Sequence, residues 1–328
     1  MAVNRDLAIG IDLGGTKILS ALIEEKGTIL AEVEMETMAS EGAEVVYNQV
    51  VSSIYKLLED SQVEKNRLLG IGIATAGVID TLKKEVVYAN NLGWENMPVG
   101  SLLESEFSLP IHIVNDANAA AIAERIWGAG KGTENLIYIT VSTGIGAGII
   151  SDGHLITGEE GSAGEFGHIS IDVNGEKCSC GNIGCLENLA SGSAIANIAR
   201  DRLQSGETSE YFTSPDHISS EEIGKASQAG DAFSLNILRE TATYIGVGVT
   251  NLIHLFNTEV IVFGGGVMNL SDILLPEIRN TVNQRGIESM TKKVKIVKSE
   301  LGSKAGVLGA VGVYFEAGSR KVLAASEN

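Results

Sequence analysis

Residues 7–24 read LAIGIDLGGTKILSALIE, and this stretch decides the fold. Small and apolar residues fill positions 7–13 and return at 17–23, so the pattern predicts two short strands. Gly14 and Gly15 stand between the two runs, and a glycine pair in that place is typical of a tight hairpin turn. We therefore expect a hairpin, with the carboxylate of Asp12 and the hydroxyl of Thr16 close to its tip.

A related pattern returns at residues 136–150, which read LIYITVSTGIGAGII. An apolar strand is predicted at 136–141, a glycine-rich turn at 143–148 and a return strand from Ile149. Because strand, glycine turn and strand occur twice, about 130 residues apart, we expect two related α/β halves that face one another across a cleft. A length of 328 residues, at about 150 residues per domain, also predicts two domains.

Hydrophobic spacing places further elements along the chain. Strands are expected at 69–74, 111–114, 259–263 and 294–297. Helices are expected at 43–59, 117–127, 191–204, 231–255 and 271–284. A last helix at 306–315 is rich in small residues, which predicts close packing against its neighbours.

The charge of the chain excludes several classes of function. Acidic residues number 42 and basic residues 24, a net charge of -18, which opposes sequence-independent nucleic-acid binding and binding to an anionic membrane. A hydrophobic share of 44% excludes intrinsic disorder. Arg5, Asp6 and Asp12 interrupt the apolar runs near the start. Each run is therefore too short for the apolar core of a signal peptide or for a membrane-spanning helix. These features predict a soluble, cytoplasmic protein.

The glycine turns have two interpretations. Glycine lets backbone N–H groups approach an anion closely, so the two turns together form a candidate two-sided phosphate clamp, with Asp12 holding magnesium. The alternative for the first turn is an ordinary hairpin with a surface lysine. A Walker motif is absent, and a strand rather than a helix follows each turn, which argues against a dinucleotide-binding motif. The predicted nucleotide-binding residues are Asp12, Gly14, Gly15, Thr16, Lys17, Thr143, Gly144, Gly146 and, after a later strand where a nucleoside would lie, Gly264, Gly265 and Gly266.

Asn115 and Asp116 end one predicted strand and open a helix. Either residue suits a helix N-cap, which is a purely structural role. The functional alternative makes Asp116 a general base for a hydroxyl group. The helix N-terminus favours the carboxylate form, so we expect such a base to be ionised at neutral pH.

Three cysteines crowd into one segment, as Cys178, Cys180 and Cys185, and His168 precedes them. An odd number in one loop is no disulfide framework. Three thiolates and one imidazole suit tetrahedral zinc, and because all four positions are filled by protein the metal would be structural. It would hold in place a loop that also carries Glu165 and Glu187. The alternative is three free cysteines.

Six motifs occur in a fixed order: DLGGTK at 12–17, VNDANAAA at 114–121, STGIGAGI at 142–149, GEFGH at 164–168, CSCGNIGCLE at 178–187 and FGGGV at 263–267. In these motifs the chain resembles the ROK family of sugar kinases and repressors, and most closely its bacterial glucokinases. The resemblance implies an actin-like, hexokinase-like ATPase fold with two α/β domains and a cleft between them. It implies a small domain of residues 1–115 plus about 305–328, and a large domain of 116–304 with the zinc loop.

The resemblance also implies a reaction and a site. The reaction is ATP-dependent phosphorylation of glucose at its 6-hydroxyl, with magnesium and a structural zinc. Asp116 matches the catalytic base. Residues implied to bind the sugar are Gly77, Asn90, Asn115, Asp116, Glu165, His168 and Glu187. His168 would bind zinc together with Cys178, Cys180 and Cys185, and turn its other ring nitrogen to the sugar. Many members have Pro-Gly where this chain has Ala76-Gly77, a departure in the sugar-side loop.

Other functions compete with this one. Repressors of the family carry a helix-turn-helix ahead of the first glycine turn, and the few residues before Asp12 leave no room for it. A chaperone-like or cytoskeletal ATPase would not need the zinc loop. Among sugars, N-acetylmannosamine, N-acetylglucosamine, mannose, fructose and allose remain beside glucose. The partners expected are therefore a hexose and ATP, with neither nucleic acid nor membrane, and the family suggests a homodimer.

Overall fold

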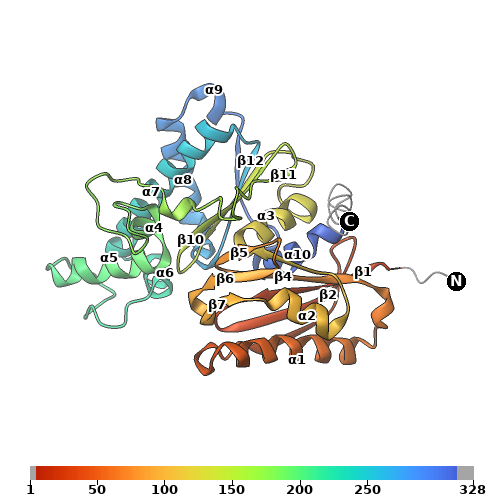
Figure 1. The fold of residues 1–328 in the computed structure, drawn as a ribbon. Coiled ribbons are helices and arrows are strands. Elements are labelled where there is room, and N and C mark those ends of the chain that lie inside the picture. The colour runs from red at the N-terminus through yellow and green to blue at the C-terminus, as the bar shows by residue number, and fades with distance from the viewer. Residues whose placement is uncertain (1–4, 316–328) are drawn as a thin grey trace. The chain divides into compact units, whose positions relative to one another are not determined.

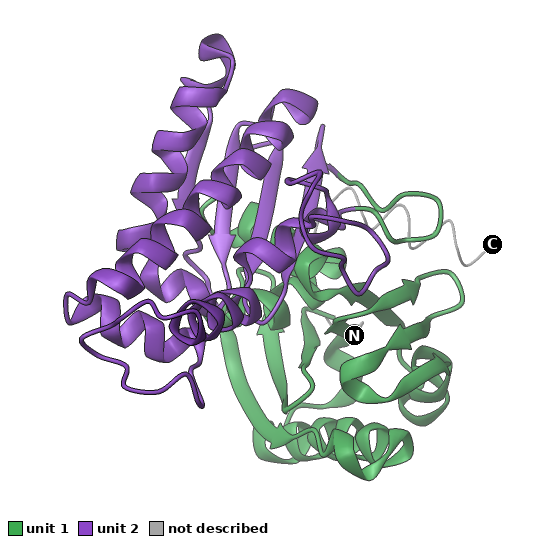
Figure 2. Ribbon diagram, turned by 90° about the vertical axis from the view of Figure 1, so that its left-hand side faces the viewer, with its two compact units in different colours: residues 1–132, 155–163, 303–328 green, residues 133–154, 164–302 purple. Residues whose placement is uncertain are grey.

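The computed structural model describes residues 5–315, and these form two compact units. Within the described residues, unit 1 holds the segments up to 132, 155–163 and from 303 onward, and unit 2 holds 133–154 and 164–302 (Figure 2). The chain leaves unit 1 after Gly132, later than the predicted boundary at 115, because helix α3 (Asp116–Trp127) packs against α10 (Ala305–Ala310). The part of the predicted small domain beyond Phe315 lies outside the described residues.

Unit 1 is built on a five-stranded sheet in the order β3-β2-β1-β4-β8. The strands are β1 (Leu7–Leu13), β2 (Lys17–Glu24), β3 (Ile29–Glu36), β4 (Leu68–Thr75) and β8 (Ile111–Asn115). β1 and β2 form the predicted antiparallel hairpin, whereas β1, β4 and β8 run parallel. Figure 1 shows α1 (Ala43–Ser61) on one face of this sheet and α3 and α10 on the other.

A smaller sheet that sequence patterning did not predict joins unit 1. Its strands are β5 (Val78–Asp80), β6 (Glu85–Ala89) and β7 (Trp94–Met97), and α2 (Val99–Phe107) follows. The strands are short and only partly buried, so neither length nor alternation marks them clearly. Trp94 anchors the sheet because its ring is fully buried and its indole N–H donates to the Ala43 carbonyl at 3.1 Å.

Unit 2 repeats the sheet pattern of unit 1 in the order β11-β10-β9-β12-β13. The strands are β9 (Leu136–Val141), β10 (Ile145–Ser151), β11 (His154–Leu155), β12 (Val260–Gly264) and β13 (Lys295–Lys298). β9 pairs antiparallel with β10 and parallel with β12, as β1 does with β2 and β4, which confirms the two related α/β halves. The predicted turn at 143–148 was wrong in length: Gly146 and Gly148 pair with residues of β9, so the turn ends at Gly144.

Helices complete unit 2. They are α4 (Leu186–Ala190), α5 (Gly192–Gln204), α6 (Ser220–Gln228), α7 (Ala232–Phe256), α8 (Ser271–Arg285) and α9 (Glu288–Thr291). Three of them, α5, α7 and α8, match the predicted ranges, whereas the short helices α4 and α9 were not predicted. Helix α6 was not predicted, although Ser219 and Glu222 form a capping box at its start. In unit 1 the predicted helix at 306–315 is divided at Val311 into α10 and α11 (Gly312–Phe315). Among the described helices, none has the length and apolarity needed to cross a membrane.

Helix α10 lies directly on the backbone of the unit 1 sheet. A Cβ atom on Gly72 of β4 would stand 1.8 Å from the Ala310 carbonyl oxygen, and one on Gly10 of β1 would stand 2.2 Å from that of Val307. On the other side, a Cβ on Gly309 would meet the Ala119 carbonyl oxygen of α3 at 1.7 Å. The expected close packing of this helix is confirmed, and each of the three contacts has a glycine on one side.

Replacing Gly72 with alanine tests this contact. We expect Gly72→Ala to lower the free energy of unfolding by about 3 kcal/mol or more, because rigid backbone stands where the methyl group must go. Gly266→Ala is the matched control, since a Cβ there has no atom within 4 Å. Thermal unfolding followed by circular dichroism compares the two variants, and equal melting temperatures would contradict the packing described.

Candidate active site

The turn between β1 and β2 presents unpaired hydrogen-bond donors. Gly14 is held inside the turn, because its N–H donates to the Lys17 carbonyl at 3.0 Å and its own carbonyl accepts from the Thr37 hydroxyl at 2.6 Å. Within residues 5–315, no acceptor takes the N–H protons of Gly15 and Thr16. Two free amides beside a hydroxyl suit an anion. Lys17 lies away from them: its ammonium pairs with Glu34 at 3.0 Å, and both side chains are exposed.

Asp12 lies near the end of β1, close to the start of α10. A Cβ on Gly306 would stand 2.7 Å from Asp12 Oδ2, so only glycine leaves the carboxylate its place. Burial, and after it repulsion from Asp116, raises the pKa of Asp12 to about 6, against a smaller opposite effect of Lys17. A nearby cation stabilises the ionised form of a partly buried carboxylate whose pKa is raised. Magnesium prefers oxygen ligands, so the Asp12 carboxylate suits the predicted magnesium.

Asp116 is the first residue of α3, directly after β8. Asn115 caps the helix, its side-chain oxygen accepting from Ala117 N at 3.0 Å and Asn118 N at 3.3 Å. Asp116 Oδ1 accepts from Ala117 N at 2.8 Å. Burial raises the pKa of Asp116, and the backbone N–H bonds that lower it are the smaller effect. Desolvation thus exceeds the opposite effect of the helix terminus, and the expectation that Asp116 is ionised at neutral pH stays a prediction.

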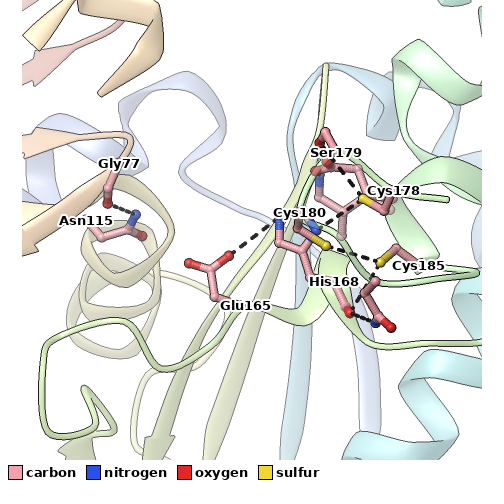
Figure 3. Close-up of polar contacts among 11 residues, drawn as sticks. Gly77, Asn115, Glu165, His168, Cys178, Ser179, Cys180 and Cys185 are labelled. Carbon is pink, nitrogen blue, oxygen red and sulfur yellow. Dashed lines mark hydrogen bonds and ion pairs between the residues drawn. The ribbon is translucent and has the colours of Figure 1, made fainter. Parts of the chain in front are cut away.

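Three more residues predicted to bind sugar lie on the same unit as Asp116. The Asn115 side-chain amide donates to the Gly77 carbonyl at 3.4 Å, so the structure brings these two together (Figure 3). Gly77 has a φ of 117°, and a Cβ there would stand 2.3 Å from the Tyr88 carbonyl oxygen. The glycine retained in the Ala76-Gly77 departure is therefore required by the backbone. Asn90 follows β6 and accepts from the Tyr88 hydroxyl at 3.4 Å.

On unit 2, the turn between β9 and β10 has the same character as the first. The start of α5 supports it, since Gly192 N–H donates to the Ser142 carbonyl at 2.7 Å and Ser193 N–H to that of Thr143 at 3.3 Å. No acceptor among the described residues takes the amide protons of Thr143 and Gly144. The hydroxyl of Thr143 stands beside these two amides, so this turn also offers an anion site.

The predicted metal ligands His168, Cys178, Cys180 and Cys185 converge, with their ligand atoms all within 4.8 Å of one another (Figure 3). Cys180 Sγ lies 3.7 Å from Cys185 Sγ, and Cys178 Sγ lies 3.7 Å from His168 Nδ1. The sulfur atoms of a tetrahedral zinc site with Zn–S bonds of about 2.3 Å are about 3.8 Å apart. The donor set and its spacing therefore fit zinc, which Nδ1 of the imidazole would bind.

The acidic residues predicted to bind sugar flank the cysteine cluster. His168 Nε2 faces Glu165, whose Oε2 lies 3.9 Å away, so the two nitrogens of the ring point in different directions. Glu165 is 63% exposed and free to meet a ligand. Glu187 follows Cys185 in the first turn of α4, and its Oε2 accepts from Ile145 N at 2.8 Å. This contact with the second glycine turn has no signal in the sequence.

A cavity of about 750 Å³ opens beside the second turn within unit 2. Thr143 lines it from the turn and Gly266 from the far side. Gly264 and Gly265 are absent from its wall: Gly265 has a φ of 90° and packs on the Val141 backbone, while Gly264 packs on Tyr138. Gly146 lies in β10, paired with Thr140 of β9. These three glycines shape the backbone around the cavity instead of facing it.

Sequence reasoning missed most of the cavity wall. Polar side chains from α5, α6 and their neighbours line it, namely Ser193, Asn197, Arg200, Ser219, Glu221, Lys225, Gln228 and Asn269. Arg200 and Lys225 bring positive charge, as a triphosphate requires. Lys225 pairs with Glu221 at 2.8 Å, and Arg200 donates to Asn197. The serine-glycine start of α5 at 191–193 was the one signal available, since such starts favour anions.

The chain is similar to known proteins over almost its whole length. The sequence profile of the ROK family matches residues 8–316. A glucokinase of Halalkalibacterium halodurans is 34% identical, covering 92% of this chain and 92% of its own length. A xylose repressor of Caldicellulosiruptor bescii is 34% identical, covering 95% of this chain and 79% of its own length. The crystal structure of a ROK family glucokinase from Streptomyces griseus in complex with glucose and AMPPNP superposes with a TM-score of 0.79 at 34% identity, covering 93% and 97% of the two chains. The predicted actin-like ATPase fold is confirmed.

Removing the charge at position 12 tests the electrostatics of unit 1. A folded-state pKa of about 6 lies above the usual 3.8, so ionised Asp12 costs stability at neutral pH and the cost disappears as the pH falls toward 4. We expect Asp12→Asn to raise the free energy of unfolding at pH 7.5 by up to about 3 kcal/mol without divalent cations, and by about half of that at pH 5. Thermal melts at both pH values, with exposed Asp60→Asn as control, measure this. A variant less stable than wild type at pH 7.5 would refute it.

The metal cluster leads to a second prediction. We expect the purified protein to contain zinc in an equimolar ratio, and Cys180→Ala to lose most of it because one of four ligands is gone. Elemental analysis by mass spectrometry measures the metal. Ile183→Ala, an exposed side chain in the same loop, is the control and should keep its zinc. Wild-type protein free of zinc after expression in zinc-supplemented medium would show that the four residues are ordinary thiols and imidazole.

Proposed function

The chain belongs to the ROK family, and from this premise we propose that it transfers the terminal phosphoryl group of ATP to the 6-hydroxyl of a hexose, with glucose as the preferred substrate. The partly buried carboxylate of Asp116, at the start of α3, is the observation that carries the proposal. Burial raises the pKa of both Asp116 and Asp12, and repulsion from Asp116 raises that of Asp12 further, so the ionised acids cost folding free energy. A module that only binds sugar does not require a base of raised pKa. A kinase needs such a base.

Asp116 would act as the general base. A sugar hydroxyl is a weak nucleophile, and the carboxylate takes its proton as the oxygen forms a bond to the terminal phosphorus. The bond between that phosphorus and the bridging oxygen breaks, and ADP leaves. The raised pKa of Asp116 makes the carboxylate a stronger base than an exposed aspartate. Magnesium, held by Asp12, would supply positive charge to the phosphate oxygens.

The glycine turns would hold the phosphates. Each turn keeps two backbone amides and a threonine hydroxyl unpaired, from Gly15 and Thr16 on unit 1 and from Thr143 and Gly144 on unit 2. Fixed donors of this kind stabilise charge as it develops and need no reorganisation during the reaction. The 750 Å³ cavity beside Thr143 has a volume suited to a nucleoside, and Arg200 and Lys225 on its wall suit the anionic phosphates.

Each unit offers groups that would bind sugar hydroxyls. Asn115 and Gly77, already joined by a hydrogen bond, supply amide and backbone groups with Asn90 nearby on unit 1. On unit 2, Glu165 and His168 supply a carboxylate and a ring nitrogen. Nδ1 on zinc would fix the ring so that Nε2 points to the ligand, a role that metal-bound histidines support through rigid orientation. The glucose complex of the Streptomyces griseus relative supports glucose as the substrate.

A sugar-responsive regulator is the second candidate, because the xylose repressor is as similar to this chain as the glucokinase. Such a protein would bind a sugar through the same residues and turn over no ATP. A coupled assay of ADP release with zinc-replete protein, over a panel of hexoses and N-acetylhexosamines, separates the two. The kinase predicts ADP release that depends strictly on one sugar class, and sugar binding without turnover would favour the regulator.

Asp116→Asn tests the role of the base. The amide accepts no proton, so we expect kcat to fall by about 10²–10⁴-fold while the Kd for the sugar changes only a few-fold. Calorimetric titration with the best sugar of the panel measures affinity, and the ADP-release assay measures kcat. Asp60→Asn, far along α1 and exposed, serves as control and should match wild type in both. A variant that retains wild-type kcat removes Asp116 from the mechanism.

A further inference from the structure

The carboxylate of Glu187 rests on the turn that is proposed to bind phosphate. Its Oε2 accepts the Ile145 N–H at 2.8 Å, and a Cβ on Gly144 would stand 2.4 Å from the same oxygen. The side chain is half-buried, so solvent screens its charge only in part. The two residues before Glu187 hold its backbone in place. Cys185 is fully buried, and Leu186 packs on Gly248 of α7.

The turn therefore has free amides that suit an anion, and the Glu187 carboxylate already lies in contact with it. The N–H groups of Thr143 and Gly144 are unpaired among the described residues, and the next amide along the chain, that of Ile145, already donates to a carboxylate. A phosphate bound to the two free amides would lie beside this negative charge. The charge has no cation within ion-pair distance among the described residues.

We propose that Glu187 gates nucleotide binding: without sugar, its carboxylate repels the terminal phosphate from the Thr143–Gly144 turn, and a bound sugar removes the repulsion by drawing the carboxylate to its hydroxyls. This inference rests on the proposed function and on the sugar-binding role that the family resemblance implies for Glu187. The sugar thus controls the affinity for ATP through one side chain, and ATP is not hydrolysed when sugar is absent.

Glu187 has two opposite effects on nucleotide affinity: its charge repels the phosphate, and its hydrogen bond stiffens the turn. The larger of the two free energies decides whether the affinity falls or rises. Two unit charges about 5 Å apart at an effective dielectric of about 20 repel by an energy worth roughly a hundredfold in affinity. The hydrogen bond to Ile145, which stiffens the turn, is worth roughly tenfold or less. Repulsion is the larger, so the carboxylate weakens nucleotide binding overall.

The side chain has room to leave the turn. A second cavity of about 520 Å³ lies on the zinc-loop side of Thr143 and Gly144, and Glu187 lines it. Asp172, Glu176 and Asp201 also line this cavity, so no cation on its wall would trap the carboxylate there. Glu187 does not line the 750 Å³ cavity, so a nucleoside placed there would meet its charge only at the phosphates.

Binding of a fluorescent ATP analogue to zinc-replete protein, with magnesium and without sugar, tests the proposal. Glu187→Gln keeps the size of the side chain and an oxygen that accepts from Ile145 N–H, and removes only the charge. We expect it to bind the nucleotide at least tenfold more tightly than wild type. Because the effect is electrostatic, the ratio should shrink at high salt, which a purely structural effect would not do. ATP hydrolysis without sugar should rise in the same variant.

Two further variants separate the possible outcomes. Glu187→Ala removes both charge and hydrogen bond, and we expect tighter binding than wild type but weaker than Glu187→Gln. Glu300→Gln, which removes an exposed carboxylate of unit 2 that lines neither cavity, should keep wild-type nucleotide affinity. If Glu187→Gln binds as wild type does and Glu187→Ala binds more weakly, Glu187 only stiffens the turn and the gate is refuted. Wild-type protein and variants that all fail to bind nucleotide would instead refute the proposed kinase.

Discussion

Two carboxylates lie at the carboxyl ends of the parallel strands β1, β4 and β8, and they determine the electrostatics of unit 1. Asp12 is near the end of β1 and Asp116 directly follows β8, with β4 between those strands, so the topology alone places both acids at the same edge. Burial and mutual repulsion raise the pKa of Asp12, and burial raises that of Asp116. When both carboxylates are ionised they lower the free energy of unfolding, and a proton or a bound cation removes that cost. In the proposed function, this cost in free energy is what magnesium at Asp12 and a substrate proton at Asp116 would relieve.

Backbone packing supplies the stability that these acids remove. Helix α10 lies on Gly10 and Gly72 closely enough that no side chain fits, and its own Gly309 lies on the backbone of α3. The same helix begins at Ala305, where Gly306 leaves space for the Asp12 carboxylate. One short helix of small residues thus anchors the sheet, positions α3 with its leading Asp116 and bounds the acidic site. A larger residue at any of these glycines would disturb fold and site together.

The sequence predicts the parts of this structure that are local. The hairpin at Gly14–Gly15, the Cys3His cluster and the strand-helix junction at Asn115–Asp116 follow from neighbouring residues, and the structure has each of them. The missed features depend on distant residues. Arg200 and Lys225 reach one cavity only because α5 and α6 both border it, and Gly146 belongs to β10 because β9 supplies a partner strand. The raised pKa of Asp116 was missed for the same reason: the helix terminus is visible in sequence, whereas burial is a property of the assembled unit.

The two similar sheets carry turns with similar hydrogen-bond donors and different electrostatic surroundings. At the first turn, the nearby cation Lys17 is held by Glu34 on the surface and the acids lie at the neighbouring strand ends. At the second, a carboxylate from the zinc loop contacts the turn itself. Because Cys185 and Glu187 are two residues apart, a metal bound by the Cys3His cluster would fix where that charge lies relative to the free amides of Thr143 and Gly144. The two turns therefore differ in the charge around their donors, whereas the donors themselves are alike.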